Sequence, residues 1–278
     1  MTFWKYESVG NDFVLTEGSP ENPESLAQFA CDRRFGVGSD GLLIANPTDR
    51  GLSLRMFNPD GTEDFCGNGL RCAVWHALRR EWFHAPFPVD HWGRTVEVRW
   101  AQDGEGLVSP TIESNLGPAS WRPEDVPLAE GLPEFAPAQV QLEGERLEIW
   151  SLNTGSTHTV VFCEKLPESP RFERLGAALE HHPAFPARTS AMFVRAEAPR
   201  DLRLRIWERG VGETLACGSG TCAAASAYLR KFGNELAGEI RAESRGGVLG
   251  VRLAAWDAPI WLRGRARCVF EGRLTWPR

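Results

Sequence analysis

The spacing of apolar and polar positions predicts an alternation of short strands and helices along the whole chain. Apolar or alternating segments of strand length are GLLIA, GLSLRMF, TVEVRW and GLVSPTIE in the first half, and VQLEGERLEIW, HTVVFC, AMFVRAE and LRLRIWE in the second. The segment FERLGAALEHH predicts a helix, and the final PIWLRGRARCVFEGRL predicts a strand pair. This order is typical of an α/β fold.

Asn22 and Pro23 form a helix-start signal. Asparagine is a favoured N-cap, and proline fits the first helical position. The pattern predicts a helix through PESLAQFACDRR. We expect it to end at Gly36, because glycine is common just beyond the end of a helix.

Two stretches of the chain resemble each other, which indicates a two-unit architecture. One reads LRMFNPDGTEDFCGNG and contains Cys66; the other reads LRIWERGVGETLACGSG and contains Cys217. Each is an apolar strand, then a loop with glycine, then Cys-Gly-x-Gly, and each leads into a predicted helix. The two cysteines lie about half the chain apart, as two tandem units require.

The predicted units are residues 1–117 and 118–264, with the active site in the cleft between them. The proline-rich stretch GPASWRPEDVPLAEGLPEFAP, which begins at Gly117, is the expected connection. Residues 265–278 are expected to return to the first unit as a strand, because the ends of a domain often lie close together.

Composition indicates an ordinary globular protein. The 278 residues are 42% hydrophobic and 24% charged, with a formal net charge of −6. No basic run stands out, so we expect no nucleic-acid partner. No apolar run approaches a membrane span, and the N-terminal MTFWKYESVGNDFVL lacks the pattern of a signal peptide. We therefore expect a cytoplasmic location and no membrane partner.

Lysine and cysteine usage narrows the chemistry. The only lysines are Lys5, Lys165 and Lys231. None lies in a motif that suits the Schiff base of pyridoxal phosphate, so we expect no cofactor. The seven cysteines do not form the close pairs of a zinc site, so we expect no metal. Unpaired cysteines suit a reducing cytoplasm.

Cys-Gly-x-Gly at a helix start combines a reactive sulfur with an anion site. The N-terminus of a helix carries unpaired N–H groups and a partial positive charge, and glycines let a ligand approach the backbone. A cysteine there is expected to have a lowered pKa, which favours its thiolate. Neither motif continues to the Lys-Ser/Thr of a phosphate-binding P-loop. We expect the other five cysteines to be structural.

Two such motifs facing each other would put Cys66 and Cys217 on opposite faces of one α-carbon, with the carboxylate at both helix starts. One thiolate would remove the α-proton and the opposite thiol would return a proton to the other face. The stereocentre would invert without redox change. The pattern therefore predicts a cofactor-independent amino-acid epimerase, whose partner is a small-molecule amino-acid substrate. A disulfide between the two sulfurs would be an oxidised, inactive form.

Several blocks give the chain a resemblance, along nearly its whole length, to the diaminopimelate epimerase family. The blocks are VGNDFV at 9–14, DRRFGVGSDGLL at 32–43, FNPDG at 57–61, CGNGLRC at 66–72, WERGVGETLACGSGTC at 207–222 and VFEG at 269–272. The resemblance implies two pseudo-symmetric halves, each a curved, mostly antiparallel sheet or open barrel around a central helix. It implies conversion of LL- to meso-2,6-diaminopimelate, in lysine and peptidoglycan-precursor synthesis, and by analogy a homodimer.

The resemblance also implies roles for single residues. Cys66 and Cys217 match the acid/base pair, and His158 matches the histidine that helps set thiol protonation. Glu208 and Arg209 match the grip on the distal, non-reacting end of the substrate, and Glu208 is also counted with the catalytic groups. The remaining substrate-binding matches are Asn11 and Asn58, and the carboxylate cradle Gly67, Asn68, Gly218 and Ser219.

Two departures from the family concern the distal end of the substrate. Serine stands at Ser156 and Ser190, where the family usually has asparagines that help to bind this end. Serine keeps a donor and an acceptor on a shorter side chain, so both serines are expected substrate contacts. The loop from Asn58 to Cys66 is also one residue shorter than is usual.

Two alternatives stay open from the sequence. The serine replacements fit a racemase with the same two-thiol chemistry on another amino acid, such as histidine or proline. The Glu208–Arg209 pair favours a zwitterionic distal end and so disfavours proline. Cys66 and Cys217 also fit a non-catalytic redox switch.

Overall fold

The computed structural model describes the chain except for residues 102, 104–105, 107, 130–136, 143 and 277–278. The chain divides into two compact units. Unit 1 comprises Met1–Asn115 and Arg263–Arg278, and unit 2 comprises Leu116–Leu262. Residues 130–136 of the expected proline-rich connection, and the last two residues of the expected C-terminal strand, lie outside the described residues.

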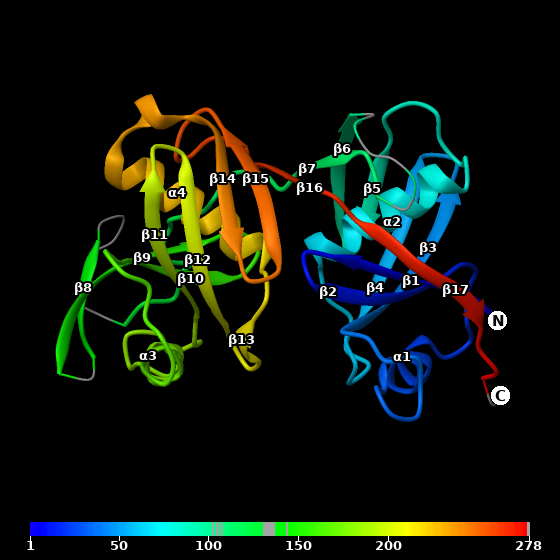
Figure 1. Cartoon of the computed structure of the whole chain (residues 1–278), viewed down its shortest axis with the longest axis horizontal. Helices are drawn as coiled ribbons and strands as arrows, with labels where there is room; N and C mark the ends of the chain where they lie inside the picture. Colours follow the sequence, from blue (N-terminus) through cyan, green and yellow to red (C-terminus); the bar gives the residue numbers. More distant parts are fainter. Residues whose placement is uncertain (102, 104–105, 107, 130–136, 143, 277–278) are drawn as a thin grey trace. The chain divides into compact units, whose positions relative to one another are not determined.

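Unit 1 is a mixed sheet with two helices (Figure 1). Its elements are β1 Thr2–Ser8, β2 Asn11–Thr16, α1 Pro23–Cys31, β3 Gly41–Thr48, β4 Gly51–Phe57, α2 Gly67–Arg79, β5 Pro88–His91, β6 Arg94–Ala101, β7 Thr111–Asn115 and β17 Arg267–Arg273. The pairs β2–β3 and β4–β5 are parallel, and each is joined through a helix, as parallel neighbours require. The other described pairs in this unit, including β17 with β1, are antiparallel.

Helix α2 is the core of unit 1. It contacts β1, β2, β3, β4, β7 and β17, so the sheet curves around it, and Figure 1 shows α2 among these strands. Leu70, Ala73, Val74 and Ala77 are fully buried. Their spacing forms one apolar stripe along the helix. Burial of this stripe fixes the start of α2, where Cys66 lies.

Unit 2 has a similar composition of elements. They are β8 Ala138–Leu142, β9 Glu145–Asn153, β10 Thr157–Phe162, α3 Arg171–Glu180, β11 Ser190–Ala198, β12 Asp201–Glu208, β13 Gly212–Thr214, α4 Gly218–Phe232, the 3-10 helix η1 Asn234–Leu236, β14 Gly238–Ser244 and β15 Gly247–Leu253. The pairs β10–β11 and β12–β14 are parallel, and the other described pairs are antiparallel. Strand β16, Trp261–Gly264, contains the point where the chain leaves this unit.

The two units repeat one topology. In each, an antiparallel pair leads through a helix to a parallel neighbour, a hairpin follows, and a central helix leads to a second parallel neighbour. In order, β1, β2, α1, β3, β4, α2, β5 and β6 correspond to β9, β10, α3, β11, β12, α4, β14 and β15. The predicted α/β fold, with a curved and mostly antiparallel sheet around a central helix in each half, is confirmed.

Helix α4 is the central helix of unit 2. It contacts β9, β10, β11, β14 and β15. Its residues Ala223, Ala224, Ala225 and Ala227 are fully buried, and these small side chains let the surrounding strands approach the helix axis closely. Neither α4 nor any other helix in the described part of the chain is long and apolar enough to cross a membrane.

The prediction for the first helix is right at its start and wrong at its end. Asn22 caps α1 by accepting the N–H of Ser25 at 3.1 Å, and Pro23 is the first helical residue. The helix ends at Cys31, before the predicted Gly36. A Cβ at Gly36 would collide with the carbonyl oxygen of Phe29. This glycine therefore permits a close return of the loop over the helix end, and it is not the cap.

Candidate active site

The two cysteines of the repeat occupy the same local position in their units. Cys66 is the N-cap of α2 with φ −137° and ψ 110°. Cys217 is the N-cap of α4 with φ −133° and ψ 115°. Each sulfur accepts the main-chain N–H three residues further on, from Gly69 at 3.4 Å and from Gly220 at 3.3 Å. Each sulfur thus lies where a capping serine would put its oxygen, at the positive end of a helix.

The second glycine of each motif is required by packing. A Cβ at Gly69 would lie 2.8 Å from a methyl carbon of Leu43 on β3. A Cβ at Gly220 would lie 2.5 Å from the sulfur of Met192 on β11. Both glycines therefore let the first helical turn rest against the adjacent strand. This explains why Cys-Gly-x-Gly is repeated and not only the cysteine.

Two asparagine amides lie beside Cys66. Its sulfur is 3.9 Å from Oδ1 of Asn11, which also accepts Nδ2 of Asn68 at 3.2 Å. Asn11 begins β2, directly after the two-residue turn Val9–Gly10, in which both residues have positive φ. Such turns match the twist of a hairpin. The hairpin thus brings Asn11 to the start of α2, next to Asn68.

His91 was not among the predicted site residues. Its Nε2 accepts the main-chain N–H of Cys66 at 2.9 Å, and its Nδ1 lies 3.1 Å from the carbonyl oxygen of Leu54. Nδ1 therefore carries the proton. Burial lowers the pKa of His91 to about 4, so the ring is neutral and Nε2 can accept. No motif marks this residue, because β5 meets the Cys66 loop only in the folded chain.

Asn58 stabilises the turn in which it lies. Its main-chain N–H and its Nδ2 both donate to Thr62, at 2.8 Å to the carbonyl oxygen and 3.1 Å to the hydroxyl. Gly61 closes the turn with φ 91° and an N–H to the carbonyl oxygen of Asn58. Asn58 therefore shapes the turn that leads to Cys66, with one N–H of its amide bonded inside the turn.

His158 and Ser219 lie beside Cys217. The sulfur is 3.9 Å from Nε2 of His158 and 3.4 Å from the hydroxyl of Ser219, which are 3.3 Å from each other. Nδ1 of His158 lies 2.8 Å from the carbonyl oxygen of Ser156 and donates to it. Nε2 is therefore an acceptor that faces the sulfur. Burial lowers the pKa of His158 to about 4, so the ring is neutral. Ser156 contributes its main chain to this arrangement.

The expectation of a lowered pKa is wrong for Cys217. Burial raises the pKa of this thiol, and the negative charge of Glu208 raises it further. Hydrogen bonds from Ser219 and Gly220 act in the opposite direction and are outweighed. The resting group is therefore a thiol. Glu208 also accepts a hydrogen bond from the hydroxyl of Thr214. Its carboxylate thus lies near the sulfur; the resemblance counted Glu208 both with the catalytic groups and with the grip on the distal end of the substrate.

The loop that carries Arg209 is anchored by two residues. Ser190 accepts the main-chain N–H of Arg209 at 3.1 Å. Glu180, which the sequence did not single out, is buried at the end of α3. Its carboxylate accepts the N–H of Gly210 at 2.8 Å and the indole N–H of Trp207 at 2.7 Å. The two anchors hold the main chain on both sides of the arginine.

Most of the predicted residues thus form two clusters, one at each helix start, whereas Asn58 lies in its own turn and Arg209 in a loop held by Ser190. Among the described residues, no group of three or more His, Cys, Asp or Glu side chains is arranged to hold a metal ion. Each of the two clusters contains a cysteine sulfur, helix N–H groups and a neutral histidine. Such clusters can transfer protons next to a bound anion.

Sequence comparison gives matches along almost the whole chain. A model of the diaminopimelate epimerase family matches residues 3–122 and 150–269. A relative from Microcystis aeruginosa named diaminopimelate epimerase is 35% identical over 286 residues and covers 97% of each chain. Another of the same name, from Desulforudis audaxviator, is 35% identical over 281 residues and covers 98% of this chain and 99% of its own.

Solved structures share the fold at low sequence identity. A probable proline racemase from Agrobacterium radiobacter, with bound carbonate, has a TM-score of 0.71 at 14% identity and covers 99% of this chain and 92% of its own. A phenazine biosynthesis protein from Bacillus anthracis has a TM-score of 0.69 at 14% identity and covers 99% of both chains. These likenesses concern the fold alone.

Proposed function

The chain belongs to the diaminopimelate epimerase family, and from this premise we propose that it converts LL- to meso-2,6-diaminopimelate with two cysteine thiols. Cys66 and Cys217 act on opposite faces of the reacting α-carbon. No cofactor takes part. The reaction serves lysine and peptidoglycan-precursor synthesis in the cytoplasm, and the enzyme is a homodimer.

The chemistry needs one base and one acid. A thiolate on one face takes the α-proton, and the electron pair of the C–H bond moves into the carboxylate as an enediolate. A thiol on the other face then gives its proton to the carbon, and the configuration inverts. Helix N–H groups stabilise the charge that develops on the carboxylate. They belong to the first turns that begin at Gly67–Asn68 and Gly218–Ser219.

Cys217 rests as a thiol, so it is ready to act as the acid. Its raised pKa keeps the proton on sulfur until a strong base, the enediolate, is present. In the reverse direction Cys217 must first lose this proton. Nε2 of His158 and the carboxylate of Glu208 are the acceptors at hand, so we assign both to the proton balance of Cys217.

Arg209 binds the distal carboxylate of the substrate. A guanidinium pairs well with a carboxylate, and the main chain of Arg209 is already held by Ser190. Ser190 is one of the two serines that favour the alternative of another amino-acid substrate. Its hydroxyl holds the Arg209 loop, so the serine has a role that does not depend on a different substrate. Substrate contacts at Asn11, Asn58, Ser156 and Ser190 complete the proposed site.

One observation carries the proposal: the two sulfurs have the same N-cap geometry and accept the same helix N–H. The test is incubation with LL-diaminopimelate and chiral chromatography of the products. We expect meso-diaminopimelate from the native chain and none from Cys66→Ala or Cys217→Ala. If L-histidine or L-proline is racemised and diaminopimelate is not, the substrate assignment is wrong. If Cys217→Ala epimerises at the native rate, the two-thiol mechanism is wrong and a redox role for the cysteines gains support.

A further inference from the structure

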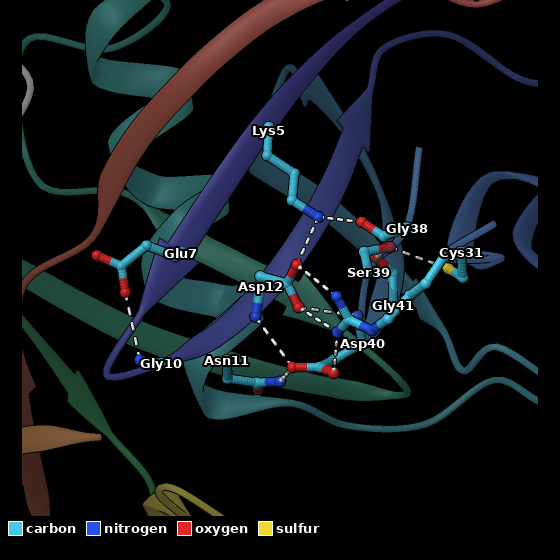
Figure 2. Close-up of polar contacts among 11 residues, drawn as sticks. Lys5, Glu7, Gly10, Asn11, Asp12, Cys31, Gly38, Ser39, Asp40 and Gly41 are labelled. Atoms are coloured by element: carbon cyan, nitrogen blue, oxygen red, sulfur yellow. Dashed lines mark hydrogen bonds and ion pairs between the residues drawn. The ribbon is translucent and has the colours of Figure 1, made fainter. Parts of the chain in front are cut away.

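A charged cluster lies directly behind Asn11 in unit 1, as Figure 2 shows. At its centre is Asp40, in a sequence block to which no role is assigned so far. One oxygen of Asp40 accepts Nδ2 of Asn11 at 2.7 Å and the main-chain N–H of Asp12 at 3.1 Å. The other oxygen accepts Arg33 at 2.7 Å. Asp40 therefore presents only acceptors to the amide of Asn11.

The rest of the cluster keeps the neighbouring carboxylate of Asp12 charged. Lys5 and Arg33 pair with Asp12 at 2.6 and 2.8 Å. Burial would raise the pKa of Asp12, but the hydrogen bonds from Arg33 and Lys5 outweigh it and hold the pKa at about 2. Lys5 also donates to the carbonyl oxygen of Gly38, in the loop that leads to Asp40. Lys5 thus holds this loop next to strand β2.

A cation lies at the other end of the same hydrogen-bond chain. The guanidinium of Arg71, which is fully buried on α2, donates to Oδ1 of Asn68 and, at 3.1 Å, to the hydroxyl of Ser8. Guanidinium groups have donors only. Asn68 must therefore turn its oxygen to Arg71 and its NH2 group to Asn11.

The cation of Arg71 at one end and the carboxylate of Asp40 at the other fix the orientation of the two amides between them, those of Asn68 and Asn11. Donors run from Arg71 through Asn68 and Asn11 to Asp40. Reversal of the Asn11 amide would set two N–H groups against each other at Asn68 and an oxygen against the carboxylate of Asp40. In the direction observed, Oδ1 of Asn11 faces the sulfur of Cys66 at 3.9 Å and accepts from its S–H.

We propose that Asp40 is a positioning residue for Cys66: it orients the amide of Asn11 so that a carbonyl oxygen, and not an N–H group, faces the sulfur. The proposal rests on the proposed function in that Cys66 is taken as one of the acid/base groups. A carbonyl oxygen beside the sulfur accepts a hydrogen bond from the S–H group and so stabilises the thiol, whereas an N–H group there would stabilise the thiolate.

The test compares Asp40→Ala with Asp40→Asn, and it needs no substrate. The alanine variant removes both the charge and the acceptor for Asn11. We expect Cys66 to react about threefold to tenfold faster with iodoacetamide at pH 7, because the thiol loses the net contribution of one hydrogen bond. Mass spectrometry resolves the Cys66 peptide, and the Cys217 peptide, whose rate should not change, is the internal reference.

The asparagine variant separates positioning from charge. It removes the same charge but keeps one oxygen where Asn11 and the N–H of Asp12 both donate. Its NH2 group then faces Arg33, which is 59% exposed and also held by Asp12, so Arg33 can move away. We expect Asp40→Asn to retain the native alkylation rate, in contrast to Asp40→Ala. Melting temperatures of both variants report on the fold.

The outcomes are distinct. If both variants alkylate faster by the same factor, Asp40 acts only through its charge and the proposal is overturned. If neither variant differs from the native protein, the amide of Asn11 is oriented without Asp40 and the proposal is again overturned. Failure to epimerise diaminopimelate would overturn the proposed function and leave the alkylation result standing.

Discussion

The main-chain N–H of Cys66 and Nε2 of His91 are joined by a hydrogen bond of 2.9 Å. His91 lies on β5, and Cys66 caps the central helix α2, so the bond ties the start of the helix to the sheet. The ring is held in one tautomer by its second bond, to the carbonyl oxygen of Leu54. The main chain that carries the sulfur is thus held by a histidine whose own position and tautomer are fixed.

Replacement of His91 by alanine should loosen the reacting sulfur. A buried N–H that loses its acceptor costs about 1–3 kcal/mol, and we expect the free energy of unfolding to fall by about this amount. We also expect kcat to fall by about tenfold, because the capping geometry of Cys66 is no longer fixed. Urea unfolding and steady-state kinetics measure the two effects. The exposed His84 offers the control His84→Ala, and equal behaviour of both variants would contradict the role of His91.

Three buried histidines predict acid lability. Burial lowers the pKa values of His76, His91 and His158 from 6.5 to about 4. Between these pH values the unfolded chain binds protons that the folded chain does not, so stability falls as the pH falls from about 6.5 to about 4. Each histidine contributes at most about 1.4 kcal/mol per pH unit in this window.

Urea unfolding between pH 7 and pH 4.5 checks this prediction. We expect the free energy of unfolding to decline steadily below pH 6.5, and we expect His91→Gln, which lacks the titrating ring, to show a shallower decline. A stability that is constant across this range would contradict the buried, neutral state of the histidines.

Glu208 should control the protonation of Cys217. The negative charge of this carboxylate raises the pKa of the thiol, second only to burial. We expect Glu208→Gln to lower that pKa, so that Cys217 is modified faster by a small alkylating reagent at pH 8. Glu213→Gln is a matched control, because Glu213 is paired with Arg205 and Arg245. An unchanged or slower modification in Glu208→Gln would contradict the assignment.

Glu180 should act on substrate affinity through the loop of Arg209. Its buried carboxylate holds Trp207 and Gly210 on either side of that loop and also pairs with Arg188. For Glu180→Ala we expect a loss of about 3 kcal/mol in stability and a KM for diaminopimelate that rises more than kcat falls. The partly exposed Glu173 on the same helix provides the control Glu173→Gln. A change in kcat alone would argue against an anchoring role.

The sequence predicts those features that depend on local order. The start of α1 follows from Asn22 and Pro23, and the helix starts after Cys66 and Cys217 follow from repeated glycines. The repeat in sequence also led to the repeat in topology, because each copy of the motif spans a whole strand–loop–helix unit.

The remaining features depend on which segments meet in space. His91 and Glu180 lie far along the chain from the main-chain groups that they hold, so no local pattern marks them. The lowered pKa predicted for Cys217 is wrong because a helix start alone does not set it: burial and Glu208 oppose the helix, and both arise only on folding. The end of α1 was misplaced because Gly36 relieves a steric contact and does not cap.

The central claim is that two thiols act on opposite faces of one α-carbon. It is tested most directly by epimerisation of LL-diaminopimelate in deuterium oxide, stopped at low conversion and analysed by mass spectrometry of the separated isomers. The thiol that donates carries solvent deuterium, and the one that accepts is a different group. We predict deuterium at the inverted α-carbon of the meso product and protium in the remaining LL substrate. A meso product that keeps its original α-proton would contradict the account, because a single base would then return the proton that it removed.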